Sequence, residues 1–405
     1  MAGRLQAGSA APRRGKLLLV TRDVDGGLGQ HFVDLAEGMA ARGWEVHCVR
    51  AEGAEGHVTK HSARLDALPG VTVHAIPLAR AIGPGDVRSY LAFRRIVTRH
   101  GPFDVAHGHG AKAGVLVRLP CRGLKARVYT PHGFITVDPA IDGRKKAIYA
   151  AIEGLFARFF TDALVAVSTQ ERDEALRLGA AKTRCHTVPN GLRPPGFLSR
   201  EQARREIGLR PEHRVALFVG RFCAQKAPER FVGLVAALAP RHPDLRGVLI
   251  GGGDAKGALV EMATALGIPD RLLFFETATA AAYMRAADLL VVPSRYEGFA
   301  YTMIEALAAG LPIVSYDVGG ADDLLLDART GYVVPQGDDG ALALGAGEIL
   351  GDPDLRRQMA KAAQERFQRF DLPTMLDGIA KVYDGLRTPL AQAGGDLAEA
   401  TGRAG

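Results

Sequence analysis

Short apolar segments alternate with longer amphipathic segments along most of the chain. The apolar runs are the length of buried parallel strands, whereas segments such as 30–42, 229–239 and 302–309 have the spacing of helices. The strands are predicted at residues 16–20, 45–49, 71–76, 105–107, 127–130 and 163–167, then at 215–219, 247–250, 272–275, 289–292, 313–316 and 332–334. This alternation predicts an α/β fold with two doubly wound parallel sheets.

A segment rich in proline and glycine separates the two series of strands. Residues 188–197 read VPNGLRPPGF, which favours neither a helix nor a central strand. We therefore predict an N-terminal domain over 16–190 and a C-terminal domain over 191–387, with a last helix free to cross back to the first domain. Residues 1–15 are expected to form a disordered leader and 388–405 a frayed tail. Because parallel sheets bind ligands at the carboxyl ends of their strands, the two domains should face each other across a cleft.

The composition is that of a soluble globular protein, with 47% hydrophobic and 23% charged residues in a chain of 405. No apolar run approaches the roughly 20 residues that cross a bilayer, and the N-terminus lacks the apolar centre of a secretion signal. The cysteines have no metal-binding spacing, and we interpret them as reduced thiols. These features predict a cytoplasmic protein.

The positive charge is concentrated in the first half of the chain. Residues 1–195 hold 28 Lys and Arg against 17 Asp and Glu, whereas residues 196–405 hold 23 against 27. A basic half indicates an anionic partner, either a membrane surface or a pyrophosphate substrate. Aromatic residues are only 6% and no nucleic-acid-binding motif is present, so nucleic acid is not expected as a partner.

The first predicted strand is followed by a glycine-rich turn that contains Gly26, Gly27 and Gly29. Backbone amides at the start of the next helix suit an anion, although a simple tight turn explains the glycines equally well. The spacing is not that of a nicotinamide-binding GxGxxG motif. Asp23 and Asp25 form a D-x-D pair, which we interpret as a solvated turn in preference to a metal site.

In the second half, Arg221 and Lys226 lie between the strand at 215–219 and the helix at 229–239. Fixed cations at this position suit a diphosphate leaving group, whose negative charge grows as its bond to carbon breaks. Because the sequence contains no convincing metal-binding cluster, these side chains would take the part that magnesium often takes. We therefore expect no metal and no cofactor.

Two glutamates stand eight positions apart in PSRYEGFAYTMIEALAAGLP, residues 293–312. Glu297 follows a predicted strand in a glycine-containing loop, and Glu305 lies on the small apolar helix that comes next. A carboxylate accepts hydrogen bonds from the two hydroxyls of a ribose or from a sugar ring. Either glutamate alone is more readily explained as ordinary surface charge, but together with the flanking motifs they favour a binding function.

The block from 287 to 338 resembles the C-terminal domain of the family 4 retaining glycosyltransferases, which have the GT-B fold. Glu297 and Glu305 match the E-x7-E motif of that family. The likeness extends over nearly all of residues 16–385 and includes GGLG at 26–29, PHGF at 131–134, VPNG at 188–191 and GR…K at 220–226. It implies two Rossmann-like domains that face each other across a cleft.

The resemblance also implies a role for each matching residue. The catalytic residues would be His132, beside the anomeric carbon, and Glu297. Glu297, Gly298 and Phe299 would contact the donor sugar, and Glu305 would bind the nucleotide ribose. The diphosphate would be held by Arg221, Lys226, Gly27 and Gly29. The implied reaction is retaining transfer from a nucleotide diphosphate sugar, with a UDP-sugar favoured, to an acceptor hydroxyl.

Two positions depart from the pattern of the family. Glu276 and Thr277 follow the strand at 272–275, where the family usually has a glycine in the loop that borders the base pocket. The GGxxE element appears as GGADD, with Asp323 in place of the glutamate.

The acceptor side is predicted from the first half of the chain. His107, His109 and Lys112 accompany the strand at 105–107, and no carboxylate stands close enough to favour a metal. Arg144, Lys145 and Lys146 precede an apolar stripe over 148–159, which suits a helix on an anionic membrane or a helix packed on its own sheet. This arrangement resembles bacterial enzymes that extend polyprenyl-linked glycans or exopolysaccharides. It implies a glycan or lipid-linked acceptor and peripheral contact with the cytoplasmic face of a membrane.

Two rival functions remain open at this stage. A sugar-nucleotide epimerase on the same fold would act on the donor without an acceptor. A protein that binds a nucleotide sugar without catalysis would keep the binding motifs and lack turnover.

Overall fold

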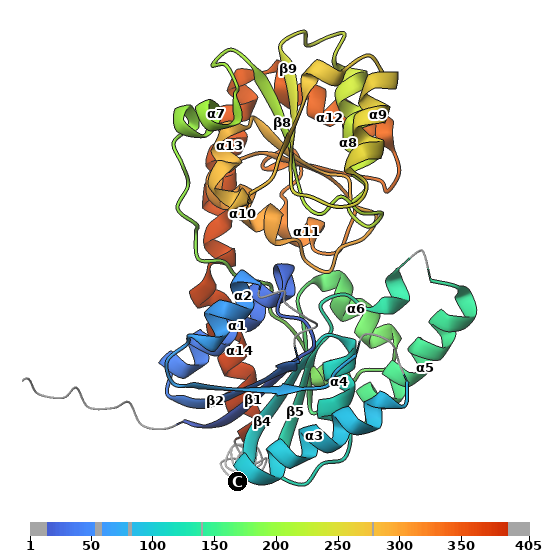
Figure 1. Ribbon diagram of the computed structural model, residues 1–405, viewed down its shortest axis with the longest axis vertical. Helices are drawn as coiled ribbons and strands as arrows, with labels where there is room; N and C mark the ends of the chain where they lie inside the picture. The colour runs from blue at the N-terminus through green and yellow to red at the C-terminus, as the bar shows by residue number, and fades with distance from the viewer. Residues whose placement is uncertain (1–13, 53–58, 80–82, 139–140, 278, 388–405) are drawn as a thin grey trace, which may run out of the picture.

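The computed structural model describes residues 14–52, 59–79, 83–138, 141–277 and 279–387, which form two α/β domains (Figure 1). The expected tail at 388–405 and residues 1–13 of the expected leader lie outside the described residues. Gly15, which the leader was expected to include, opens the first strand. The fold class predicted from the sequence, two parallel sheets in Rossmann-like domains, is confirmed.

The N-terminal domain contains a seven-stranded parallel sheet in the order β3-β2-β1-β4-β5-β6-β7. Its strands are β1 (Gly15–Thr21), β2 (Trp44–Ala51), β3 (Val71–Ile76), β4 (Phe103–His109), β5 (Leu124–Thr130), β6 (Ala163–Ala166) and β7 (Cys185–Thr187). Its helices are α1 (Gly26–Ala41), α2 (Lys60–Asp66), α3 (Gly85–His100), α4 (Ala111–Arg118), α5 (Gly143–Phe159) and α6 (Thr169–Arg177). Strand β7 was not predicted, because Cys-His-Thr is short, polar and only half-buried at the edge of the sheet.

The C-terminal domain contains a six-stranded parallel sheet in the order β10-β9-β8-β11-β12-β13. Its strands are β8 (Arg214–Val219), β9 (Leu245–Ile250), β10 (Leu272–Phe275), β11 (Leu289–Val292), β12 (Ile313–Tyr316) and β13 (Gly331–Val334). Its helices are α7 (Arg200–Ile207), α8 (Pro228–Leu238), α9 (Lys256–Ala265), α10 (Tyr301–Ala309), α11 (Ala321–Leu324), α12 (Asp339–Gly351) and α13 (Pro353–Phe367). One continuous apolar core fills this domain.

The last helix, α14 (Leu372–Arg387), crosses back and packs on the N-terminal domain (Figure 1). Together with α1 it covers one face of the first sheet, and α3 and α4 cover the other face. The approach of α14 to α1 is close, since a Cβ atom at Gly38 would lie 2.4 Å from Leu376 Cδ1. The chain therefore passes between the domains twice, near Gly191 and again near Asp371, whose carbonyl would lie 2.4 Å from a Cβ atom at Gly191.

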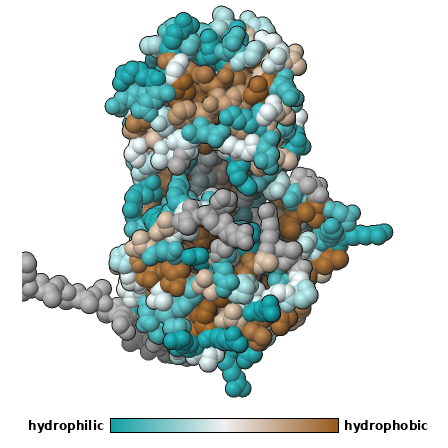
Figure 2. Space-filling model, viewed as in Figure 1, coloured by the Kyte–Doolittle hydropathy of each residue, from teal (hydrophilic) through white to brown (hydrophobic). Residues whose placement is uncertain are grey.

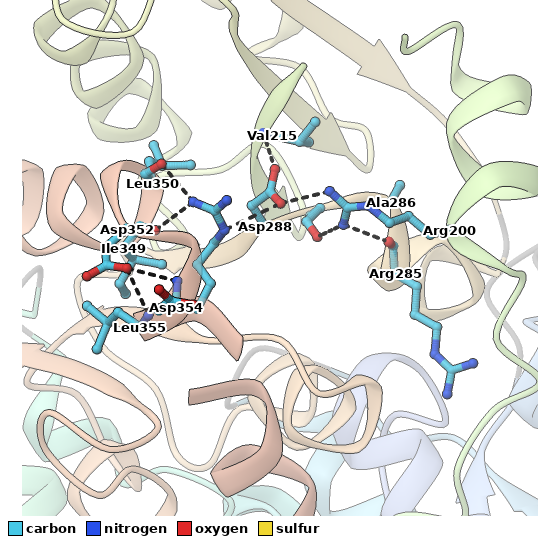
Figure 3. Close-up of polar contacts among 12 residues, drawn as sticks. Arg200, Val215, Arg285, Ala286, Asp288, Ile349, Leu350, Asp352, Asp354 and Leu355 are labelled. Atoms are coloured by element: carbon cyan, nitrogen blue, oxygen red, sulfur yellow. Dashed lines mark hydrogen bonds and ion pairs between the residues drawn. The ribbon is translucent and has the colours of Figure 1, made fainter. Parts of the chain in front are cut away.

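Asp288, just before β11, ties helix α7 to the second sheet (Figure 3). Its carboxylate accepts a hydrogen bond of 2.8 Å from the backbone amide of Val215 and pairs with Arg200 at 2.8 Å. Asp352 caps the start of α13 through the amides of Asp354 and Leu355. The contacts of Asp288 lie at the amino ends of β8 and β11. The carboxyl ends of these strands, on the opposite edge of the sheet, are not occupied by them.

Candidate functional site

The carboxyl ends of the two sheets face each other across a pocket of about 150 Å³. The N-terminal domain contributes Gly133 and Phe134, after β5, and Glu171 on α6. The C-terminal domain contributes Glu297 and Gly298, after β11, and residues 317–319, after β12. In a parallel sheet the loops that follow the strands lie together at one edge. Because the two sheets face each other at these edges, each domain contributes one half of the site.

The two domains approach each other closely where Gly298 meets the turn at His132. A Cβ atom at Gly298 would lie 2.9 Å from both the carbonyl carbon and the carbonyl oxygen of His132, which only glycine avoids. His132 itself has a φ of 55°, an uncommon conformation for a residue with a side chain. The predicted catalytic histidine and the predicted sugar-binding loop are thus in contact.

Lys226 and Glu297 form an ion pair in this region, with 2.6 Å between Nζ and Oε1. Their side chains are 19% and 7% exposed, so the pair is shielded from solvent on most sides. Lys226 lies in the loop after β8 and Glu297 in the loop after β11, and these strands are neighbours in the sheet. Because β8 and β11 are adjacent, Lys226, the predicted diphosphate-binding residue, lies beside Glu297, the predicted sugar-binding residue.

Arg221 follows β8 by two residues and is exposed. Among the described residues its side chain makes no ion pair, in contrast to Lys226. The backbone of this loop is fixed by the glycines after β9, since the Phe222 amide donates to the carbonyl of Gly252 at 2.8 Å. Arg221 thus offers an unpaired guanidinium at the carboxyl end of a central strand.

Glu305 lies in the middle of α10, on a half-buried face of an otherwise apolar helix. Burial raises the pKa of its carboxyl to about 7, and the charge of Lys60 on α2 opposes this shift. A buried carboxyl group of this kind is suited to hydrogen bonds from neutral hydroxyls.

The glycine-rich turn forms the first turn of α1, where Gly29 N donates to the Asp25 carbonyl at 2.9 Å. Gly27 is exposed and faces Tyr301 at the start of α10, since a Cβ atom there would lie 3.0 Å from Tyr301 Cδ2. The amino terminus of α1 therefore points toward the C-terminal domain, as a helix that binds an anion across the cleft would.

His132 belongs to a group of histidines from three elements of the N-terminal domain. His132 Nε2 is 3.0 Å from Nδ1 of His109, the last residue of β4. His31, on α1, packs against both rings with centroid distances of 4.7 and 5.3 Å. Burial lowers the pKa of His31 to about 4 and holds the pKa values of His109 and His132 well below the usual range, so all three rings are neutral at pH 7.

His107 lies beneath this group and is fully buried. Its Nδ1 is 2.6 Å from the Tyr383 hydroxyl on α14, and its Nε2 is 2.8 Å from the Thr130 hydroxyl. Both ring nitrogens are bound within the fold, so in this conformation neither is available to an acceptor.

Asn190 in the VPNG segment links the two domains at the base of the site. Its side-chain oxygen is 2.9 Å from His31 Nδ1, and its side-chain nitrogen donates to the Phe299 carbonyl at 3.3 Å. Because the amide nitrogen is used by Phe299, the oxygen faces His31, and His31 Nδ1 must be the donor. The tautomer of His31 is thereby fixed.

Glu171 on α6 holds the turn that carries His132. Its carboxylate accepts hydrogen bonds from the amides of Gly133, at 2.5 Å, and Val167, at 2.8 Å. Burial raises its pKa to about 7, although these two hydrogen bonds oppose the shift. Glu171 thus fixes the backbone beside the predicted catalytic histidine.

The other residues predicted on the acceptor side lie in separate environments. Lys112 on α4 pairs with Asp86 on α3 at 2.5 Å. Arg144 and Lys145 are exposed at the start of α5 and Lys146 is half-buried there, and none of them lines the pocket between the domains. The structure therefore does not bring the predicted acceptor residues into one site.

The two departures from the family pattern also have defined places. Glu276 and Thr277 line a hollow with Gly251 and Gly252, where Glu276 pairs with Lys256 at 2.8 Å. Asp323 on α11 accepts hydrogen bonds of 2.6 Å from the amide and hydroxyl of Thr169, across the domain boundary. Asp323 thus joins the domains rather than facing the pocket.

His31, Asn190 and Glu171 contribute to the site although the sequence assigned them no role. His31 follows the glycine-rich turn by two residues, which is the one local signal that marked it. Glu171 reaches the site only through the packing of α6, and no sequence spacing relates it to Gly133.

Two Rossmann-like domains whose parallel sheets face each other at their carboxyl ends are the architecture of the GT-B glycosyltransferases. Residues 26–191 match the family model for the glycosyl transferase 4-like domain, and residues 199–366 match the model for glycosyl transferases group 1. The chain belongs to this family of glycosyltransferases.

Relatives that match most of the chain include D-inositol 3-phosphate glycosyltransferases. The D-inositol 3-phosphate glycosyltransferase of Nocardia farcinica is 30% identical over 388 residues, covering 88% of this chain and 84% of its own. The D-inositol 3-phosphate glycosyltransferase 2 of Catenulispora acidiphila is 35% identical over 396 residues, covering 88% and 90%.

Solved structures share the fold at lower identity. Sucrose-phosphate synthase from Thermosynechococcus elongatus has a TM-score of 0.78 at 22% identity, covering 92% of this chain and 99% of that one. Anabaena Alr3699/HepE in complex with UDP-glucose has a TM-score of 0.77 at 20% identity, covering 92% and 100%. These likenesses support the two-domain architecture.

Proposed function

We propose that the chain is a retaining glycosyltransferase that moves a sugar from a UDP-sugar to an acceptor hydroxyl without a metal ion. The Lys226–Glu297 ion pair, in contact through Gly298 with the His132 turn, carries this proposal. Glu297 and Gly298 line the pocket between the domains, Lys226 binds Glu297, and His132 directly precedes the lining residue Gly133. This arrangement supports a donor bound there, with a cation near its diphosphate and an acid and a neutral histidine near its sugar. The UDP-glucose complex of Alr3699/HepE, a protein with the same fold, is consistent with this type of donor.

In the proposed reaction, Arg221 and Lys226 neutralise the diphosphate, and the amino terminus of α1 adds backbone amides. Glu305 binds the ribose hydroxyls. Glu297 binds the donor sugar. His132 accepts a hydrogen bond from the donor sugar or contacts that sugar as a neutral ring. The acceptor attacks from the side on which the diphosphate leaves, and the departing phosphate takes the acceptor's proton.

We propose a lipid-linked glycan acceptor in polysaccharide biosynthesis, because α5 presents both charge and apolar surface. Arg144 and Lys145 are exposed at its start, and Ile148, Leu155 and Phe159 are 59%, 52% and 63% exposed along it. Figure 2 shows hydrophobic surface on this side of the N-terminal domain. In the described part of the chain no helix is long and apolar enough to cross a membrane, so contact would be peripheral.

A second candidate acceptor is a soluble phosphorylated polyol. The D-inositol 3-phosphate glycosyltransferases match this chain over most of both lengths, at 30% to 35% identity. A phosphorylated acceptor would also suit the basic first half of the chain.

The test combines a panel of UDP-sugars with three acceptor conditions: a polyprenyl-linked glycan, inositol 3-phosphate and no acceptor. UDP release that requires either acceptor and persists in EDTA supports metal-free transfer and identifies the acceptor class. A new UDP-sugar formed without an acceptor would indicate an epimerase. Binding of UDP-sugar without turnover in every condition would indicate a protein that has lost catalysis.

A further inference from the structure

The histidine group at the base of the cleft has the features of a metal-binding site. One ring nitrogen from each of His31, His109 and His132 lies within 4.8 Å of the other two. The three residues come from α1, the end of β4 and the turn after β5, so the group is held by the core of one domain. Three histidines with a water molecule in the fourth position are a familiar zinc ligand set.

Two nitrogens of this group are buried without a partner. His31 Nε2 and His109 Nε2 make no hydrogen bond with any described residue, although His31 and His109 are at most 1% exposed. Buried polar atoms are almost always paired, so two unpaired nitrogens in one cluster indicate that something else binds there. Since His31 Nδ1 donates to Asn190, the unpaired Nε2 carries a lone pair.

The surroundings also suit a metal. A histidine that binds a metal usually donates its other N–H to a carbonyl or carboxylate oxygen, as His31 does to the side-chain oxygen of Asn190. Within the described residues no carboxylate belongs to the cluster, and a ligand set of imidazoles alone favours Zn²⁺, Cu²⁺ or Ni²⁺ over Mg²⁺ or Ca²⁺.

We propose that His31, His109 and His132 form a binding site for a divalent transition metal ion, with Zn²⁺ as the representative ligand. Zinc–nitrogen bonds of about 2.0–2.1 Å require the three rings to move together slightly, and His132 must exchange its contact with His109 for the ion. The bound ion holds the His132 turn in place.

Because His132 takes part in the proposed transfer, an ion bound to its ring should inhibit transfer rather than assist it. This consequence depends on the proposed function, whereas metal binding itself does not. If no donor supports transfer, the Zn²⁺ titration still tests metal binding. If no Zn²⁺ binds, the UDP-release assay still tests the proposed transfer.

The test uses the full chain without a histidine tag, freed of metal by EDTA and dialysis. Titration calorimetry with Zn²⁺ should give one ion per chain, and His31→Gln and His109→Gln should each weaken binding about 10- to 100-fold. His74→Gln is the matched control, because His74 pairs with His47 at 3.0 Å in a separate histidine cluster. It should leave the affinity for Zn²⁺ unchanged.

A second readout uses the unaltered protein, in case the buried substitutions disturb folding. Co²⁺ added to the metal-free chain should give the intense visible absorption of a four- or five-coordinate ion and should be displaced by Zn²⁺. The proposal is overturned if Co²⁺ keeps the spectrum of the hydrated ion, if no Zn²⁺ binds, or if His74→Gln weakens binding as much as His31→Gln does.

Discussion

Replacing Lys226 with alanine separates two roles that the structure gives to one side chain. The ammonium group binds Glu297 at 2.6 Å in the free protein, and in the proposed function it also faces the diphosphate of the donor. Its loss should therefore affect stability through Glu297 and turnover through the leaving group.

The effect on stability follows from what remains after the substitution. The Glu297 side chain is only 7% exposed and would lose the one cation that pairs with it among the described residues, while Lys226 at 19% exposure still reaches solvent. Removing one partner of a buried pair costs about 3–5 kcal/mol, and partial solvent access reduces this to about 1–3 kcal/mol. In a domain of this size that corresponds to a fall in Tm of about 2–12 °C.

The effect on turnover follows from the charge that develops on the leaving group. Loss of one preorganised contact to such a charge costs roughly 10²- to 10³-fold in kcat. Acceptor-dependent UDP release measures kcat, and differential scanning fluorimetry measures Tm in the same preparations.

The double variant Lys226→Ala with Glu297→Gln distinguishes the two roles. Because it removes the unpaired charge, it should recover most of the lost Tm while its turnover stays at least about 10²-fold below wild type. Turnover near the wild-type value in Lys226→Ala would refute the diphosphate role. A double variant as unstable as Lys226→Ala would refute the reasoning about the ion pair.

Three further predictions address the rest of the site and the proposed membrane surface. Gly298→Ala forces the backbones at Gly298 and His132 apart and should lower kcat/KM about 10²-fold. The control Gly257→Ala, where a Cβ atom meets open space, should leave kcat/KM unchanged. Equal kinetics in the two variants would contradict the close approach of Gly298 to His132. Glu305→Gln should weaken UDP binding in calorimetry. Burial raises the pKa of Glu305 from 4.5 to about 7, so between these pH values the folded chain keeps a proton that the unfolded chain releases. In urea unfolding, the wild type should therefore lose stability relative to Glu305→Gln as the pH rises from about 4.5 to about 7. A difference in stability that stays constant with pH would contradict the burial of Glu305. The double variant Ile148→Glu with Phe159→Glu should reduce sedimentation with anionic vesicles about 10-fold or more without changing turnover on a soluble acceptor. Unchanged sedimentation would contradict a contact between α5 and the membrane.

The fold could be predicted from the sequence because its strands are buried on both faces. Segments such as Leu289–Val292 are continuous apolar runs with turn residues on either side, and the structure places a strand there with the same bounds. Cys185–Thr187 has no such signal, because an edge strand contributes few buried side chains. The sequence allows the last helix to return to the first domain, but the contacts that hold α14 there, such as Tyr383 with His107, join distant residues and no local pattern contains them.

The candidate site was predictable only where one loop carries the signal. Lys226 and Glu297 were found separately, through motifs after two strands, but their direct pairing follows from the adjacency of β8 and β11. His107 carried the same local signal as His109, yet one is bonded within the core and the other borders His132. Alternation along a strand does not tell how far toward the cleft each side chain lies.

A crystal structure of the protein with an intact UDP-sugar analogue would show directly where the donor binds. We expect the diphosphate at Arg221 and Lys226, the ribose at Glu305 and the sugar between Glu297 and His132. Electron density for the nucleotide at any other part of the surface, with Lys226 still bound only to Glu297, would contradict it.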